Sequence, residues 1–160
     1  MSRRDFLGVF GGMFLFAVSA WASEPNQAEE QAIAAIKKAG GEIRRETASP
    51  TAPVIAVRFG CHSEATDAEI VLLKCLPDLQ ELVIVGKKVT DKGLEPLQNL
   101  SKLQSLVLNC TSATDTTLGR LKGLTSLKKV YIRYSNVTEQ GIKDLAKALP
   151  DTNIKHIPLP

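Results

Sequence analysis

The chain has 160 residues and a formal net charge of +3, with 20 lysine and arginine residues against 17 aspartate and glutamate residues. Because both signs are interspersed, the chain lacks the clustered basic stripe that would predict nucleic-acid binding. Three cysteines are too few for a disulfide scaffold. Aromatic residues make up only 5% of the chain, which indicates a repetitive core built mainly from leucine.

The N-terminus has the pattern of a signal peptide. Arg3 and Arg4 precede an apolar run over residues 6–20, and small residues at positions 20 and 22 suit cleavage after Ala22. An uncleaved membrane anchor is the alternative, but the run is short for a span and contains glycines. We therefore predict a signal peptide over residues 1–22 and no stable membrane insertion after its removal.

Residues 2–7, Ser-Arg-Arg-Asp-Phe-Leu, resemble the bacterial twin-arginine export motif S-R-R-x-F-L-K, with Gly8 in place of the lysine. The resemblance implies export of an already folded protein. An ordinary secretory signal that carries two arginines is the alternative. Both alternatives place the mature chain outside the cytoplasm, in the periplasm or the extracellular space.

Residues 23–53 are predicted to form an N-terminal cap helix and a linker. Asn26 and Glu29 have the spacing of a capping box, and small apolar residues follow at helical period. Gly40 and Gly41 are expected to end this helix. Residues 44–53, which contain two prolines, are expected to form a loop. The apolar stripe predicts packing against the rest of the chain, with a partner-binding helix as the alternative.

From residue 54 to residue 160 the chain repeats an apolar pattern every 24 residues. Three segments begin at Leu76, Leu100 and Leu124, and an earlier, less regular one precedes them. The repeated positions predict one continuous core. They are Leu82, Leu106 and Val130; Ile84, Leu108 and Ile132; Val89, Ala113 and Val137; Leu94, Leu118 and Ile142; and Leu97, Leu121 and Leu145, with Val57, Phe59, Ile70 and Leu73 in the earlier segment.

This pattern resembles the leucine-rich repeat, and is most similar to the "VTDxGL" repeats of exported bacterial proteins, planctomycetes especially, and to cysteine-containing repeats. The resemblance covers about residues 54–157. It implies an α/β fold, a leucine-rich-repeat solenoid of about four repeats. It also implies parallel strands on a concave face, helical returns on a convex face and a helical cap at the N-terminus.

A threonine followed by an acidic residue precedes each return segment. A threonine oxygen suits a helix N-cap, and a carboxylate suits the first turn, so we predict structural caps. A calcium site is the alternative, but one carboxylate in each segment supplies too few oxygen ligands. The pairs are Thr90 and Asp91, Thr114 and Asp115, and Thr138 and Glu139.

The turn after each predicted strand carries a polar residue: Lys87, Thr111 or Ser135. The hydroxyls of Thr111 and Ser135 are expected to bond to backbone in the turn, a role that the Lys87 side chain cannot fill. The tail predicts one last short strand around Ile154, which Pro158 ends.

The sequence contains no evident catalytic or metal site. Cys61 and His62 are adjacent, but neighbouring side chains on extended backbone point opposite ways, which disfavours a nucleophile and base pair. His156 lies several strands away, so the two histidines cannot share a metal. The cysteines are expected to be free and largely buried. We predict a protein that is not an enzyme and needs no cofactor, with a hydrolase or redox protein using Cys61 and His62 as an alternative.

Residues between the core positions of the strands are expected to point outward on the concave face. Valines, tyrosines and arginine there suit protein recognition, although valines also simply favour strands. We predict an exported, non-enzymatic leucine-rich-repeat module that binds another protein or an envelope polymer through this face, with a self-assembling structural protein of the envelope as the alternative. The candidate binding residues are Arg58, Val83, Val85, Val107, Asn109, Lys129, Tyr131, Arg133 and Tyr134.

Overall fold

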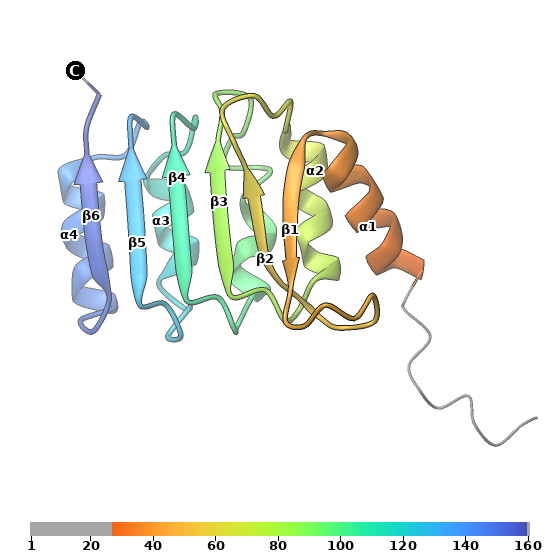
Figure 1. Cartoon of the computed structure of the whole chain (residues 1–160). Coiled ribbons are helices and arrows are strands. Elements are labelled where there is room, and N and C mark those ends of the chain that lie inside the picture. Colours follow the sequence, from red (N-terminus) through yellow and green to blue (C-terminus); the bar gives the residue numbers. More distant parts are fainter. Residues whose placement is uncertain (1–26, 160) are drawn as a thin grey trace, which may run out of the picture.

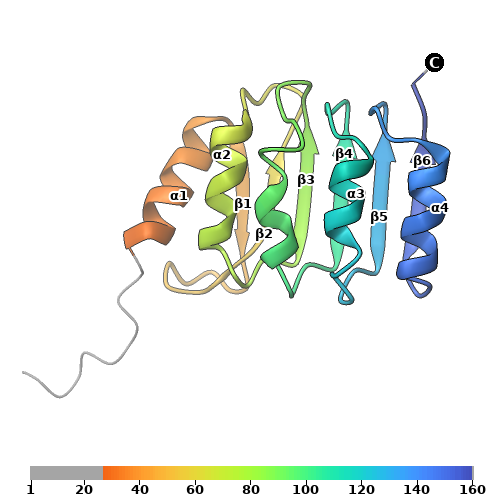
Figure 2. The ribbon, with the colours of Figure 1, turned by 180° about the vertical axis from the view of Figure 1, so that it is seen from behind.

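The computed structural model describes residues 27–159 and has one sheet of six strands with its helices packed on one side (Figure 1; Figure 2 shows the helical side). The strands lie in chain order across the sheet, so the α/β class predicted from the sequence is confirmed. The predicted signal peptide over residues 1–22, its cleavage site at Ala22 and the cap residue Asn26 lie outside the described residues.

No helix within residues 27–159 has the length and apolar character needed to cross a membrane.

The sheet consists of β1 (Gly41–Arg45), β2 (Val54–Phe59), β3 (Glu81–Val85), β4 (Ser105–Asn109), β5 (Lys129–Arg133) and β6 (Asn153–Ile157). The helices are α1 (Gln27–Lys38), α2 (Asp67–Val71), α3 (Asp115–Leu121) and α4 (Glu139–Ala148), with 3₁₀ helices η1 (Leu72–Cys75) and η2 (Glu95–Asn99).

Strands β2 to β6 are parallel, and β1 pairs antiparallel with β2. The presence of β1 corrects the sequence prediction, which assigned residues 44–53 to a loop. Arg44 and Arg45 belong to the strand, and the loop begins after them. The alternation that makes this strand is only five residues long: Ile43 is partly buried against the core, while Glu42 and Arg44 are exposed.

Helix α1 packs beside β1 at the end of the sheet (Figure 1). Ala32, Ile33 and Ile36 on its inner side are buried, so the predicted stripe packs against the rest of the chain. Gly40 follows the helix with a φ of 78°, a left-handed conformation that glycine adopts without a steric penalty. The predicted cap helix and its glycine stop are therefore confirmed over the described residues.

The core lies between the sheet and its helices. The residues predicted for this core are buried except Ile142, which is partly buried and packs against the others. Strand pairing follows the sequence spacing, since Leu82 lies beside Leu106 and Leu106 beside Val130. Leucine dominates this core because the same positions recur and side chains of one size stack well on each other.

Helix caps form at two of the three predicted threonines, Thr114 and Thr138, and also at Thr66 in the earlier segment. The hydroxyls of Thr66, Thr114 and Thr138 accept hydrogen bonds from backbone N–H groups at the starts of α2, α3 and α4. No α-helix begins at Thr90, which corrects the prediction for that segment. Pro96 lacks an N–H and disfavours helical backbone before it, so a turn and the short η2 replace the helix.

The aspartate that follows Thr66, Thr90 or Thr114 bonds to the next segment of the chain. Asp91 accepts hydrogen bonds from the backbone N–H of Thr114 at 2.9 Å and from its hydroxyl at 2.7 Å. Asp67 bonds in the same way to Thr90, and Asp115 to Thr138. We call these three contacts the Asp–Thr ladder. It ties successive segments together on the helical side, whereas the sequence predicted only that the carboxylates would suit their own helices.

The polar turn positions differ from their predicted role. Thr111 and Ser135 are buried, and within residues 27–159 their hydroxyl oxygens have no hydrogen-bond partner. Lys87 at the matching position is exposed. Cys110 and Tyr134, which precede the two hydroxyl residues, adopt left-handed φ values of 53° and 52° and turn the chain sharply after β4 and β5.

Candidate functional site

The candidate site is the side of the sheet that no described helix covers, which we call the open face (Figure 1). Because successive side chains of a strand alternate between sides, every second residue of each strand points to this face. Strand pairing aligns these residues in rows that run across the sheet. The central row is Glu42, Arg58, Val83, Val107, Tyr131 and Lys155.

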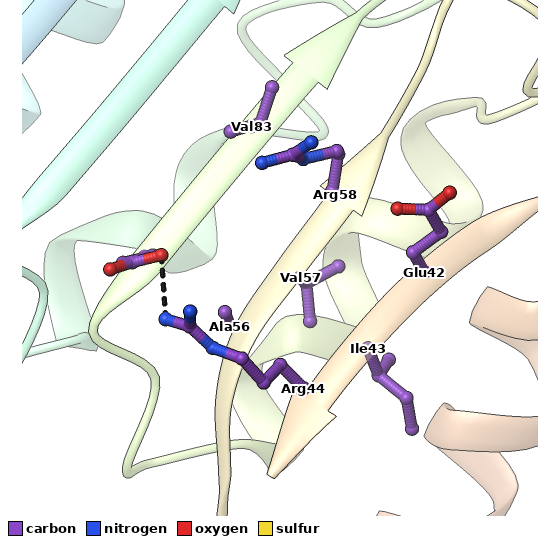
Figure 3. A pocket seen from close by; sticks show the side chains of 8 residues that line it. Glu42, Ile43, Arg44, Ala56, Val57, Arg58 and Val83 are labelled. Carbon is purple, nitrogen blue, oxygen red and sulfur yellow. Dashed lines mark ion pairs between the residues drawn. The ribbon is translucent and has the colours of Figure 1, made fainter. Parts of the chain in front are cut away.

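At the N-terminal end the open face contains a hollow of about 240 Å³ lined by β1, β2 and β3 (Figure 3). Arg44 on β1 reaches across β2 to Glu81 on β3, with a guanidinium nitrogen 2.8 Å from a carboxylate oxygen. Ala56 lies beside Arg44 and Glu81 in the pairing, and its small side chain lets the arginine pass over β2. Glu42 points toward the same side of the hollow as Arg58 (Figure 3).

The middle of the open face is apolar. Val83 and Val107 are direct neighbours on β3 and β4, and both are partly exposed. Val85 lies two residues further along β3, beside Asn109. These valines leave a strip of methyl groups in contact with solvent between the charged ends of the sheet.

At the C-terminal end the open face is basic. Lys129 and Arg133 flank Tyr131 on β5, and Lys155 lies beside Tyr131 on β6. The Lys155 ammonium lies 5.6 Å from the centre of the Tyr131 ring, a cation–π contact. No ion pair found within residues 27–159 involves Lys129, Arg133 or Lys155. We call Lys129, Tyr131, Arg133 and Lys155 the basic–tyrosine cluster.

The structure brings eight of the nine predicted binding residues onto this face. Tyr134 is the exception, because it follows β5 in a left-handed turn; its side chain is 42% exposed. Sequence analysis missed Glu42 and Arg44 because it did not predict β1. It also missed Lys155, although the predicted strand around Ile154 and the 24-residue spacing from Tyr131 could have placed it.

Cys61 and His62 lie in a turn after β2, not on extended backbone. The Cys61 sulfur is 3.3 Å from Nδ1 of His62, so the prediction that they point apart is wrong. Both side chains are exposed, and among the described residues no hydrogen bond orients the other ring nitrogen of His62. In a catalytic triad a third group orients the base by a hydrogen bond, so the contact between Cys61 and His62 alone does not form a triad.

All three cysteines are free, as predicted, but Cys61 is exposed, and Cys75 and Cys110 are only partly buried. The expectation that all three are largely buried is therefore wrong for Cys61. Across residues 27–159, no group of three histidine, cysteine, aspartate or glutamate side chains is arranged to hold a metal ion.

No protein-family model and no curated protein matches the chain.

Proposed function

We propose that the chain is a leucine-rich-repeat solenoid of about four repeats, with the open face as its concave side. Support comes from the 24-residue spacing, which recurs in the apolar core, in strand pairing and in the Asp–Thr ladder. A single 24-residue unit cannot bury its apolar side alone, and stacking the units gives each one a neighbour to pack against.

The protein acts, in this proposal, as a non-enzymatic module that binds another protein through the open face. The observation that carries it is the uncovered central row, in which Val83, Val107 and Tyr131 lie side by side. Tyrosine and arginine are enriched among the residues that dominate binding energy, and methyl groups in contact with solvent gain from being covered. Charged groups around the strip supply the polar rim that such interfaces have.

Export through the N-terminal segment is part of the same proposal. The paired arginines and the apolar run of residues 1–22 support a periplasmic or extracellular location. Mass spectrometry of the secreted fraction would test it, since cleavage after Ala22 leaves Ser23 as the first residue. Retention of the intact chain in the cytoplasm would contradict export.

A second candidate function is self-assembly edge to edge. It is favoured by β6, which has no neighbour on its outer side among the described strands. Ile157, the last residue of β6, and Leu159 just after it are 39% and 51% exposed. Pro158 between them opposes further strand pairing because it lacks an N–H. Sedimentation of the purified chain over a range of concentrations would separate a monomer from an assembling protein.

The binding function is tested by affinity capture from cell-envelope extract with three forms of the full chain. The open-face variant is Val107→Glu/Tyr131→Glu, and the matched control is Ala34→Glu/Ala146→Glu. The control adds the same charge at exposed positions of α1 and α4. A partner that the wild type and the control retain and the open-face variant loses, and that binds again as a purified protein, would support the proposal.

Equal capture by all three forms would contradict recognition through the open face. Circular dichroism of each form before capture shows whether the substitutions preserve the fold.

A further inference from the structure

The two ends of the open face differ in charge. Among the residues that point to this face, the acidic ones, Glu42 and Glu81, lie on β1 and β3. Strands β4, β5 and β6 contribute no acidic residue to it and contribute three cations, Lys129, Arg133 and Lys155. The valine strip separates these two ends.

The basic–tyrosine cluster is arranged around one ring. Lys129 and Arg133 lie two residues on either side of Tyr131, which separates their backbones by about 13 Å along the strand. Lys155 approaches the ring from the next strand. All three cations are exposed, so each ammonium or guanidinium group can bond to an incoming anion without first leaving a carboxylate.

Unlike the three cations of the basic–tyrosine cluster, Glu81 already forms an ion pair, with Arg44. Glu42 is exposed at the far end of the central row, with no ion pair among the described residues. Arg58 is also exposed, and it lies directly beside Glu42 on β2, so their opposite charges balance. The open face therefore has no net charge over β1 to β3 and a net positive charge over β5 and β6.

From this asymmetry we propose that the partner presents a short acidic peptide segment, with carboxylates over the basic–tyrosine cluster and apolar side chains over Val83 and Val107. The inference deepens the proposed function and rests on it. Carboxylates would face Lys129, Arg133 and Lys155, and the adjoining side chains would cover the valine strip.

A long polyanion fits this face less well than a peptide does. A nucleic acid or acidic polysaccharide extending across the sheet would meet the valine strip, which offers its phosphates or sugars no hydrogen bond. It would then reach an end of the face where two glutamates, Glu42 and Glu81, balance the charges of two arginines. Stacking of successive bases needs several aromatic side chains, and Tyr131 is the only one that the described strands place on the open face. A peptide can change from acidic to apolar within a few residues and so match both regions.

The experiment selects binders from a displayed library of random 12-residue peptides against the full chain. The charge variant is Lys129→Gln/Arg133→Gln/Lys155→Gln. Its control, Lys92→Gln/Lys122→Gln/Lys143→Gln, removes the same charge at exposed positions outside the strands. The variant Val107→Glu/Tyr131→Glu reports whether a selected peptide uses the open face, and a 12-residue oligothymidylate serves as the competing polyanion.

We expect the selected peptides to be enriched in aspartate and glutamate next to apolar residues. Their Kd should rise about tenfold in the charge variant, remain unchanged in the control and rise with salt concentration. Peptides that depend on the open face but carry no acidic excess would overturn this inference and leave the proposed function standing. Peptides that bind all variants equally would overturn both, and tighter binding of oligothymidylate than of any selected peptide would overturn the acidic-peptide assignment.

Discussion

Glu69 accepts hydrogen bonds from both the backbone N–H and the hydroxyl of Thr66, at 2.8 and 2.6 Å. In the later segments the same two threonine groups bond to an aspartate of the segment before, as Thr114 does to Asp91. Thr66 has no such aspartate before it, and a glutamate three residues further on takes its place. Glu69 therefore closes the first end of the Asp–Thr ladder.

Removing this closure should destabilise the first segment. We expect Glu69→Ala to lower the free energy of unfolding by about 1–2 kcal/mol, because two donors of Thr66 lose their acceptor. Urea unfolding followed by circular dichroism measures the change. The control Glu64→Ala removes an exposed carboxylate two residues before Thr66 and should change stability by less than about 0.5 kcal/mol. Equal losses in the two variants would argue against a special role for Glu69.

The ladder should also make stability depend on pH. Burial alone would raise the pKa of Asp91, but hydrogen bonds from Thr117 and Thr114 outweigh it and hold that pKa below its ordinary 3.8. Because the folded pKa is lowered, ionised Asp91 stabilises the fold fully above the unfolded pKa. That stabilisation is lost as the pH falls through the lower, folded value.

The measurement compares urea unfolding of the wild type and Asp91→Asn between pH 7 and pH 2.5. We expect the wild type to be more stable at neutral pH and the difference between the two proteins to shrink as the pH falls below about 3.8. A difference that stays constant across this range would mean that the charge of Asp91 does not contribute.

The core and the order of the parallel strands could be predicted because the apolar positions recur at one spacing. The 24-residue spacing alone places Leu82 beside Leu106 and Leu106 beside Val130. The antiparallel β1 was missed because its pattern is short and its only clear apolar residue is Ile43. A strand of this kind is defined by its pairing with β2, which a local pattern does not reveal.

The candidate site could be predicted where it depends on alternation along a strand, as for Val107 and Tyr131. Contacts that depend on how the chain folds in three dimensions could not be predicted from the sequence. The Asp–Thr ladder joins residues 23 apart, and the sequence showed a recurring Thr-Asp pair without its partner. The side chains of Cys61 and His62 come together because the chain turns there. The sequence prediction assumed extended backbone, in which neighbouring side chains point opposite ways.

Two buried threonines should respond in opposite ways to the same substitution. The Thr111 hydroxyl has no partner among the described residues, whereas the Thr117 hydroxyl donates a hydrogen bond to Asp91. We expect Thr111→Val to raise the free energy of unfolding by about 1 kcal/mol, because a methyl group replaces an unpaired hydroxyl of similar size. Thr117→Val should lower it by a similar amount. Losses of stability in both variants would show that the Thr111 hydroxyl has a partner.

Two helical glycines offer the sharpest test of the ladder. A Cβ at Gly141 in α4 would overlap the Asp115 carboxylate, whereas a Cβ at Gly119 in α3 would meet nothing within 4 Å. The Asp115 carboxylate cannot move aside freely, because the N–H and hydroxyl of Thr138 hold it at 2.9 and 2.6 Å. Gly141→Ala should therefore lower the free energy of unfolding by about 1–3 kcal/mol.

Gly119→Ala should instead raise the free energy of unfolding by about 0.5–1 kcal/mol, since alanine favours the helix and the site has room for its methyl group. Both variants are measured by urea unfolding at pH 7. The double variant Gly141→Ala/Asp115→Ala separates the overlap from other effects of alanine. Once the carboxylate is gone, Gly141→Ala should cost less than it does in the wild type. If its cost were unchanged, contact with Asp115 would not be the reason for glycine at position 141.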